Sequence, residues 1–302
     1  MSLTNGRRLA PPGTTPAASA APGGIAAASA PRGAGVDEPA PGQNGVVPGA
    51  CGSGTTTAAL QVSEVSKVYG RGEAALLALD KVSLSVAPGE FVCLIGASGC
   101  GKSTLLNLAA GLDTPTSGGV RAQGRVALMF QEPALFPWLT AGRNVEIALR
   151  ARGVPKQDRG VRTAELLEAV HLAGFGSKRP HELSGGMRQR VALARALAQD
   201  ADVLLMDEPF GALDAMTRDL LHDELERICA ERTLTVLFVT HNVREAARLG
   251  DRVLLMSSRP GRVIEEYQVP RTGPRRIDSA QVAELAGRMT DRLREEMSRH
   301  GH

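Results

Sequence analysis

The fold is decided by the stretch Phe91-Val-Cys-Leu-Ile-Gly-Ala-Ser-Gly-Cys-Gly-Lys-Ser-Thr104. Its first five residues are a wholly apolar run after the turn Pro88-Gly89, so they predict a buried parallel strand. After Lys102 the sequence reads as a helix that includes Leu105 to Ala110. A plain glycine turn is the alternative, but a glycine loop between a strand and the start of a helix is the context that a P-loop requires.

The residue types of this loop suit the binding of phosphate. Gly96, Gly99 and Gly101 lack a Cβ, so successive backbone N–H groups can point at one phosphate. The helix N-terminus adds about half a positive charge. We expect Lys102 to reach the β- and γ-phosphates and the Ser103 hydroxyl to bind Mg²⁺. The predicted phosphate-binding set is Gly96, Ala97, Ser98, Gly99, Cys100, Gly101, Lys102, Ser103 and Thr104.

A second apolar run, Val203 to Met206, ends in the two carboxylates Asp207 and Glu208. Two exposed acids at a strand end are common, but here Pro209-Phe-Gly-Ala-Leu-Asp214 follows directly. We expect Asp207 to hold Mg²⁺ through a water molecule. Glu208 is then placed to polarise the attacking water as a general base.

A third motif, Leu183-Ser184-Gly185-Gly186-Met187, lies between the first two. It opens a helix that runs through Val191 to Leu197, which makes a second N-terminal anion site with a serine donor. Ser-Gly-Gly alone is more often a linker or a helix cap. Its place before a helix and upstream of the Asp-Glu strand makes the motif specific.

Together the three motifs resemble those of the ATP-binding-cassette (ABC) ATPases, over roughly residues 60–269. The resemblance implies an α/β fold: a P-loop NTPase cassette with a RecA-like core, a small antiparallel β subdomain and a helical subdomain. It implies ATP and Mg²⁺ as cofactors. It also implies that Ser184, Gly185 and Gly186 bind the γ-phosphate held on the P-loop of a second copy, in a head-to-tail dimer.

Four further positions match this family one at a time. Gln131 resembles the glutamine that touches Mg²⁺ or the attacking water, and His241 resembles the histidine that contacts the γ-phosphate. Asp214 belongs to the segment that the family places at the dimer interface, where it would help to bind the nucleotide. Tyr69 resembles the aromatic residue that stacks on adenine, and an ordinary surface tyrosine stays open as the alternative.

One branch of the family is the most similar. The segment Met129 to Thr140, which contains Phe136-Pro-Trp138, looks like that of the importers of nitrate, sulfonates and taurine. The segments 210–218 and 257–262 fit the same group. The stretch from Lys102 to Gln131 is short, as if a hairpin were trimmed around residues 119–125, which is most similar to sulfonate-type members. The transported substrate is not identified.

The resemblance implies partners and a location. The chain would be the ATP-hydrolysing subunit of an importer, peripheral on the cytoplasmic face of the cell membrane. It would contact integral membrane permease subunits directly and a solute-binding protein indirectly. Phe136-Pro-Trp138 would be the surface that docks on the permease, with ordinary packing in the helical subdomain as the alternative.

Two other classes of function are weighed against the importer. A soluble cassette ATPase acting on nucleic acid or ribosomes usually carries two cassettes, a long coiled coil or zinc cysteines. A P-loop kinase would lack the Ser184-Gly-Gly element and His241. The net charge of +3 and the 3% aromatic content also argue against nucleic acid as a partner.

Composition and pattern divide the 302 residues into three parts. Residues 1–57, rich in Ala, Gly and Pro, are predicted to be a disordered tail. Residues 58–270 would form the cassette, with its helical subdomain at about 132–198 and an antiparallel pairing of 60–62 with 81–86. Residues 271–302 would form a basic linker and a C-terminal helix. The apolar stripe of that helix is Val282, Leu285, Met289, Leu293 and Met297.

The spacing of the cysteines argues against disulfide and metal sites, and the length of the apolar runs argues against a membrane-spanning segment. The four cysteines have no CxxC or metal-ligand spacing, so we expect reduced thiols, as in a cytosolic protein. No apolar run reaches the roughly 18 residues of a membrane span.

Overall fold

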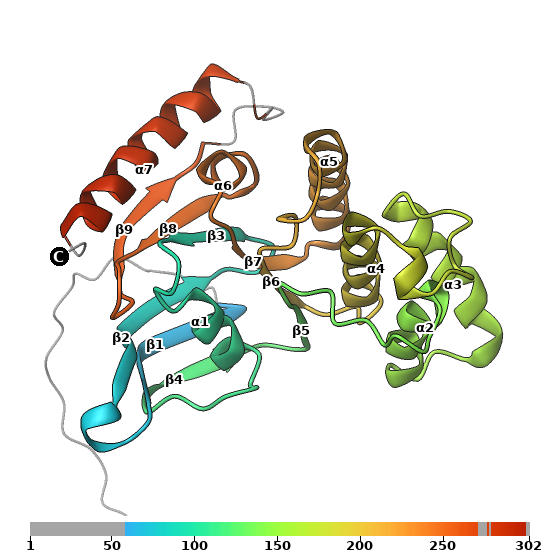
Figure 1. The fold of residues 1–302 in the computed structure, drawn as a ribbon, viewed down its shortest axis with the longest axis horizontal. Helices are drawn as coiled ribbons and strands as arrows, with labels where there is room; N and C mark the ends of the chain where they lie inside the picture. The colour runs from blue at the N-terminus through green and yellow to red at the C-terminus, as the bar shows by residue number, and fades with distance from the viewer. Residues whose placement is uncertain (1–57, 271–276, 278, 300–302) are drawn as a thin grey trace, which may run out of the picture. The chain divides into compact units, whose positions relative to one another are not determined.

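Two β-sheets of different kinds organise the computed structural model, which describes residues 58–270, 277 and 279–299 (Figure 1). The tail predicted at 1–57 lies outside these residues. The smaller sheet is antiparallel with the strand order β2-β1-β4. Its strands are β1 (Leu60–Tyr69), β2 (Leu76–Val86) and β4 (Ser117–Ala122). Leu60 pairs with Val86 and Val62 with Leu84, as the sequence predicts for these two segments.

The larger sheet has the order β5-β6-β7-β3-β8-β9. Its strands are β3 (Phe91–Gly96), β5 (Val126–Met129), β6 (Val203–Asp207), β7 (Thr235–Val239), β8 (Arg252–Met256) and β9 (Val263–Gln268). The first five strands in this order are parallel, and only the pairing of β8 with β9 is antiparallel. The carboxyl ends of the parallel strands therefore share one edge, where sites of α/β proteins form.

The helices fall into two groups in Figure 1. α1 (Lys102–Ala109), α5 (Ala215–Arg232), α6 (Val243–Leu249) and α7 (Ala280–Arg299) lie around or beside the larger sheet, and α1 packs also on β2 and β4. α2 (Ala141–Ala151), α3 (Lys156–Ala169) and α4 (Gly185–Leu197) pack on one another in a separate helical lobe. Two 3-10 turns, Gly72–Ala74 and Pro180–Glu182, complete the described elements. In the described part of the chain, no helix has the length and apolar character needed to cross a bilayer.

The central strands β3, β6 and β7 of the larger sheet are buried on both faces, and alternate side chains of each strand point to opposite sides. On β3, Cys93 and Ile95 join the core that contains the helical lobe, α6 and α7. Val92 and Leu94 join a second core with α1 and the antiparallel sheet. This two-sided burial explains why β3, β6 and β7 read as continuous apolar runs rather than as alternating patterns.

Helix α7 packs on the core through the first part of its apolar stripe. Val282, Leu285 and Met289 are buried, and Leu293 packs against them partly exposed. The prediction is wrong for Met297, whose side chain is 52% exposed in the last turn. The buried residue there is Glu296, whose Oε1 accepts a hydrogen bond from the backbone N–H of Ser258 at 3.4 Å.

A buried asparagine fixes the loop that leads into the helical lobe. Asn144 is fully buried on α2, and its Oδ1 accepts from the backbone N–H of Phe136 at 2.8 Å. Its Nδ2 donates to the carbonyls of Phe136, Leu139 and Thr140 at 3.0–3.3 Å. One side chain thus replaces the secondary structure that the loop lacks, and it sets the path of residues 136–140.

Candidate functional site

The predicted P-loop forms the connection between β3 and α1. Gly101 has a φ of +102°, and a Cβ at this position would lie 2.6 Å from Leu79 Cδ2, so only glycine fits. Lys102 is only 7% exposed, and its Nζ donates to the carbonyl oxygens of Gly96 and Ala97, each 2.9 Å away. These two neutral carbonyl oxygens hold the Lys102 ammonium inside the loop. A bound phosphate could take their place as the acceptor of its hydrogen bonds.

Two further side chains help to describe the P-loop: Cys100 lies within it, and Arg259 contacts it from a distant segment. Cys100 is buried, and burial raises the pKa of its thiol although the nearby Lys102 charge opposes this shift. Arg259 donates from Nε and Nη2 to the carbonyl of Gly99 at 3.2 and 3.1 Å. The sequence alone does not connect residue 259 with the P-loop, because the contact joins segments 160 residues apart.

Ser103, at the start of α1, hydrogen-bonds to the carboxylate of Asp207, at the end of β6. Burial raises the pKa of Asp207, the Ser103 hydrogen bond opposes this rise, and the neighbouring Glu208 charge adds to it. A hydroxyl beside a carboxylate offers the hard oxygen ligands that Mg²⁺ prefers, and Mg²⁺ usually takes its other ligands from water and substrate phosphates. The pair therefore fits the ion that the resemblance implies.

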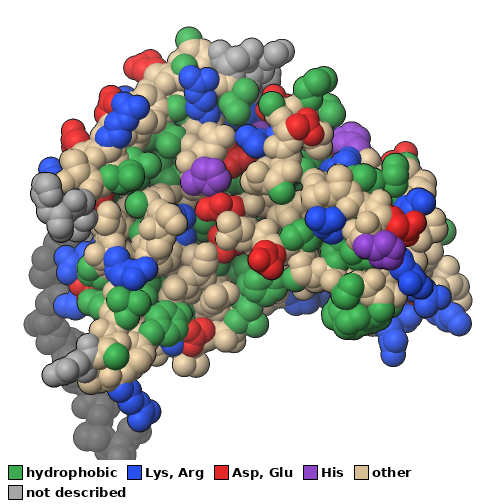
Figure 2. All heavy atoms as spheres, in the orientation of Figure 1, with side chains coloured by type: hydrophobic (Ala, Val, Ile, Leu, Met, Phe, Trp, Pro, Cys, Tyr) green, Lys and Arg blue, Asp and Glu red, His purple; other side chains and the backbone are tan. Residues whose placement is uncertain are grey.

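Three predicted site residues meet at one oxygen of Glu208. His241 Nδ1 lies 3.0 Å from Glu208 Oε2, and Gln131 Nε2 donates to the same oxygen at 3.4 Å. The backbone of Glu208 has a φ of +46° and donates its N–H to the carbonyl of Val239 at 2.9 Å. Figure 2 shows acidic and histidine side chains together near the centre of the visible face. The arrangement places the Glu208 carboxylate between a histidine and an amide, both of which contact the same oxygen.

The predicted second anion site lies on the helical lobe. Ser184 caps α4, and its Oγ accepts from the backbone N–H of Met187 at 3.2 Å. α4 packs on α2, α3 and β5, whereas α1 packs on β2, β3, β4 and β6. The helix start at Ser184-Gly185-Gly186 therefore belongs to the helical lobe, whereas the P-loop belongs to the part of the fold that holds the two sheets.

A glutamine that the sequence analysis did not single out joins the lobe to the site. Gln189 is buried on α4, and its Nε2 donates to the backbone carbonyl of Gln131 at 3.2 Å. Arg195, two turns further on, donates to the carbonyls of Pro133 and Ala134 at 2.9 and 2.8 Å. The backbone that carries Gln131 is thus held by α4, while its side chain faces Glu208.

Asp214 and Tyr69 have clear local partners. Asp214 caps α5, and its carboxylate accepts from the N–H and the hydroxyl of Thr217 at 3.0 and 2.8 Å. The backbone hydrogen bond from Thr217 is the main cause that lowers the pKa of Asp214. Tyr69 is 39% exposed at the end of β1 and donates its hydroxyl to Asp113 at 3.1 Å. Lys67 Nζ lies over the ring of Tyr69, 4.9 Å from its centroid. Tyr69 is the side chain that we expect to stack on adenine.

Comparison with known proteins assigns the family. The model of the ABC transporter family matches residues 79–211. A nitrate import ATP-binding protein from Synechocystis sp. is 44% identical over 218 residues, which cover 70% of this chain and 82% of that protein. The chain belongs to the ABC transporter family. The ATPase activity that the sequence motifs predict is thereby confirmed.

Further relatives and a solved structure agree with this assignment. A taurine import ATP-binding protein from Burkholderia pseudomallei is 46% identical, over 70% of this chain and 85% of that protein. An aliphatic sulfonates import ATP-binding protein from Mesorhizobium japonicum is 48% identical, over 72% and 83%. A dimeric ATP-binding cassette solved with ADP and Pi is 34% identical, with a TM-score of 0.66 over 70% of this chain and 99% of that one. The predicted α/β cassette fold is confirmed.

The position of Glu208 generates a first prediction. Replacing Glu208 with Gln keeps the size of the side chain and leaves the P-loop intact, so the ATP affinity should stay within a few-fold of wild type. Loss of the base should slow hydrolysis by about 10²- to 10⁴-fold. Phosphate release in single-turnover assays measures the rate, and Glu231→Gln, an exposed change on α5, is the matched control. Wild-type turnover by Glu208→Gln would remove the general base from this position.

Proposed function

We propose that this ABC ATPase energises the import of a small anion or organic solute of the nitrate, taurine and sulfonate class. The observation that carries the ATP-hydrolysing part of the proposal is the meeting of Gln131, Glu208 and His241 at the shared edge of β3, β6 and β7. The printed names of the relatives, which are nitrate, taurine and aliphatic sulfonates import proteins, supply the class of solute. They favour a transporter over a cassette acting on nucleic acid.

In the proposed mechanism the residues of one chain bind ATP and prepare the water. Lys102 would exchange the carbonyls of Gly96 and Ala97 for phosphate oxygens, and the P-loop N–H groups would hold the same phosphates. Ser103 and Asp207 would hold Mg²⁺, which supplies charge neutralisation for the phosphates. Glu208 would accept the proton of the attacking water, and Gln131 and His241 would orient that water and the γ-phosphate.

A second copy of the chain would complete each site. Ser184-Gly185-Gly186 offers a helix N-terminus on the helical lobe, away from the P-loop of its own chain. In a head-to-tail dimer this helix start would face the γ-phosphate held by the partner, and Asp214 would lie at the interface. The dimeric state of the similar ADP- and Pi-bound cassette supports this arrangement.

The shared site can be tested by mixing two inactive variants. Ser184→Arg should abolish ATPase activity and leave nucleotide binding by the monomer nearly unchanged, because the added cation fills the pocket for the partner's γ-phosphate. Lys102→Ala should be inactive as well. A head-to-tail heterodimer of the two contains one site with both lesions and one site with neither. Mixing should therefore restore part of the activity, and full activity of Ser184→Arg alone would refute the shared site.

The helical lobe carries the surface that would bind a permease. Trp138 is 69% exposed and packs on Phe136 with ring centroids 5.5 Å apart, which argues against the alternative of a buried packing role. Trp138 and the exposed Ile147 line a groove of about 480 Å³. Figure 2 shows hydrophobic side chains at the lower edge of this lobe with basic side chains nearby. The groove is also lined by Leu139, Arg143, Glu146, Arg150, Lys156 and Arg159.

The chemistry of this groove describes the permease segment that would fit it. Four basic side chains against the single acid Glu146 favour a segment with acidic residues. The apolar floor favours an apolar anchor on the same segment, and an exposed tryptophan is itself a frequent interface anchor. The proposed partner is a short amphipathic cytoplasmic segment of an integral membrane permease, and this partner would place the chain on the cytoplasmic face of the membrane.

Trp138→Ala tests the docking surface. Association with the permease should weaken by about 2 kcal/mol or more, which is typical of an interface anchor, while basal ATPase activity of the free subunit is kept. Co-purification with the permease and uptake by intact cells measure the loss. Phe175→Ala is the matched control, since Phe175 is an exposed aromatic residue in the same lobe. Unfolding of the isolated Trp138→Ala subunit would instead assign Trp138 to packing, and unchanged association would place the docking surface elsewhere.

Growth of a deletion strain tests the solute class. Cells without the gene should fail to grow on one class of sole sulfur or nitrogen source among nitrate, taurine and alkanesulfonates. The wild-type gene should restore growth, whereas the Glu208→Gln gene should not, because uptake needs hydrolysis. Normal growth of the deletion strain on all three classes would refute the proposed solute class.

A further inference from the structure

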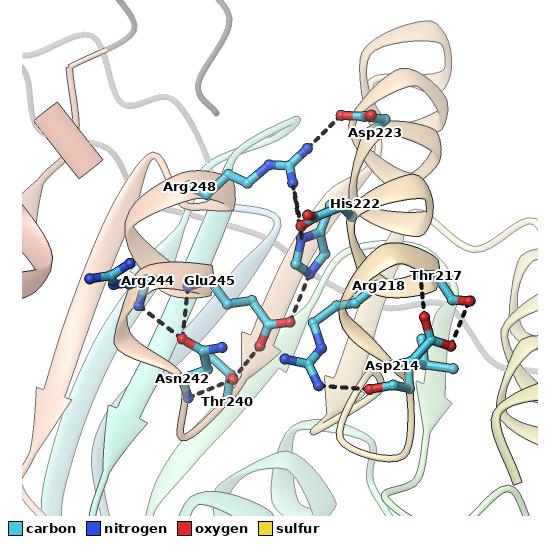
Figure 3. Close-up of polar contacts among 12 residues, drawn as sticks. Asp214, Thr217, Arg218, His222, Asp223, Thr240, Asn242, Arg244, Glu245 and Arg248 are labelled. Atoms are coloured by element: carbon cyan, nitrogen blue, oxygen red, sulfur yellow. Dashed lines mark hydrogen bonds and ion pairs between the residues drawn. The ribbon is translucent and has the colours of Figure 1, made fainter. Parts of the chain in front are cut away.

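A chain of buried polar side chains runs from α5 to the residue before His241 (Figure 3). Its members are His222 on α5, Glu245 and Arg248 on α6, and Thr240 after β7. All four side chains are buried, although three of them are titratable. Buried ionisable groups are costly unless each has a partner, so such a chain needs an explanation beyond packing. The mechanism proposed above does not use any of them.

At one end of this row of buried side chains, Thr240 closes a turn around His241. The Thr240 hydroxyl donates to Glu245 Oε2 and accepts from the backbone N–H of Asn242 at 3.0 Å. The backbone N–H of Thr240 donates to the carbonyl of Leu94 on β3 at 3.2 Å. His241 lies inside this turn with a largely exposed side chain that reaches Glu208. The direction of the imidazole is therefore set by a turn whose hydroxyl is held by Glu245.

Glu245 is itself fixed by a contact of its second carboxylate oxygen with His222 and by a backbone hydrogen bond at the start of α6. Glu245 Oε1 lies 2.8 Å from His222 Nε2. The backbone N–H of Glu245 donates to Asn242 Oδ1 at 3.3 Å, which caps the start of α6. Both carboxylate oxygens are thus committed to partners, so Glu245 cannot rotate without breaking a buried hydrogen bond.

At the other end, Arg248 selects the tautomer of His222. Arg248 Nη1 lies 3.2 Å from His222 Nδ1, and a guanidinium can only donate, so Nδ1 accepts. His222 then carries its proton on Nε2 and donates to Glu245. Arg248 also pairs with Asp219 and Asp223 at the rim of α5. Arg248 therefore donates to His222, and His222 donates to Glu245 Oε1. Thr240 donates to the other oxygen of the same carboxylate, Oε2.

The His222 ring also touches the segment that follows the general base. The ring packs edge-on against Phe210 with centroids 5.0 Å apart. Phe210 is buried two residues after Glu208 and packs on Phe238 of β7. The same imidazole therefore supports the backbone beyond Glu208 and, through Glu245, the turn that carries His241.

We propose that Glu245 and Thr240 are positioning residues that hold His241 against Glu208, and that His222 ties them to α5. α5 is capped by Asp214, which lies in the segment expected at the interface with the second copy. A shift of α5 when the dimer closes would therefore reach Thr240, the residue before His241, through two buried hydrogen bonds, His222 to Glu245 and Thr240 to Glu245. This inference rests on the proposed function only for the role of His241 toward the γ-phosphate.

Matched substitutions of buried hydroxyls test the proposal. Thr240→Val removes the hydroxyl and keeps the shape of the side chain, and Thr240→Ser restores the hydroxyl. Thr235→Val is the control, because Thr235 is a buried threonine at the opposite end of β7, where its Oγ accepts from the N–H of Gly89. ATPase rates of the full chain are measured for each variant in the wild-type background and in a His241→Ala background, together with melting temperatures.

The pattern of rates distinguishes positioning from general stabilisation. Thr240→Val should lower kcat by about tenfold to hundredfold, as expected for a misplaced group in a site, whereas Thr240→Ser and Thr235→Val should stay close to wild type. In the His241→Ala background, Thr240→Val should cause no further loss, since its effect acts through His241. An equal loss in both backgrounds would show a purely structural role and would overturn the proposal.

Nitrogen-15 NMR of histidine side chains gives a readout that does not depend on hydrolysis. The chain has only six histidines, so His241→Ala and His222→Gln suffice to assign the two signals. Thr240→Val should shift the His241 imidazole, Thr235→Val should not, and His222 should show a proton on Nε2. An unmoved His241 signal in Thr240→Val would overturn the proposal. Wild-type activity of His241→Ala would instead refute the function proposed for His241, and the NMR comparison would still decide the positioning role.

Discussion

The register of three buried parallel strands is the constraint on which the site depends. Leu94 of β3 pairs with Val239 of β7, and Val239 pairs with Asp207 of β6. The residues that follow are tied across the same edge, because Glu208 donates its N–H to Val239 and Thr240 donates to Leu94. A slip of one residue would exchange the side chains of a strand between the two cores. Closely packed cores do not accept side chains of different volume and shape at the same positions, so core packing fixes this register. The placement of the P-loop, the carboxylates and His241 against one another is thus a consequence of core packing.

The parts of the fold that the sequence predicted are those with strong local signals. The runs before Gly96 and Asp207 are apolar enough to be buried strands in any context, and glycines at fixed spacing mark the loop between β3 and α1. β4 could not be predicted in the same way, because its sequence Ser117-Gly-Gly-Val-Arg-Ala122 has no alternation, and it is a strand only by pairing with β1. The contact of Arg259 with the P-loop and the buried hydrogen bonds that link His222 to Thr240 could not be predicted for the same reason. Their roles come from contacts between distant segments, for which single residues leave no pattern.

The loop from Gln131 to Thr140 is where the helical lobe and the nucleotide-binding edge are joined. At its start the side chain of Gln131 faces Glu208, while Gln189 of α4 holds its carbonyl. At its end Asn144 of α2 fixes the backbone around the exposed Trp138. Both ends are held by side chains of α2 and α4 rather than by regular secondary structure. A movement of the lobe therefore has a direct path to Glu208, and an event at Glu208 has the same path back to the surface that we assign to the permease.

The left-handed backbone of Glu208 has a consequence for how this protein can change. A φ of +46° is unfavourable for any residue with a Cβ and costs on the order of 1 kcal/mol or more, whereas glycine adopts it freely. The chain therefore accepts a less stable fold in order to aim a carboxylate at one point. With Glu208 as the general base that we propose, a glycine at residue 208 would relieve this strain and also remove the base. Thermal stability and turnover would then be opposed at this single position.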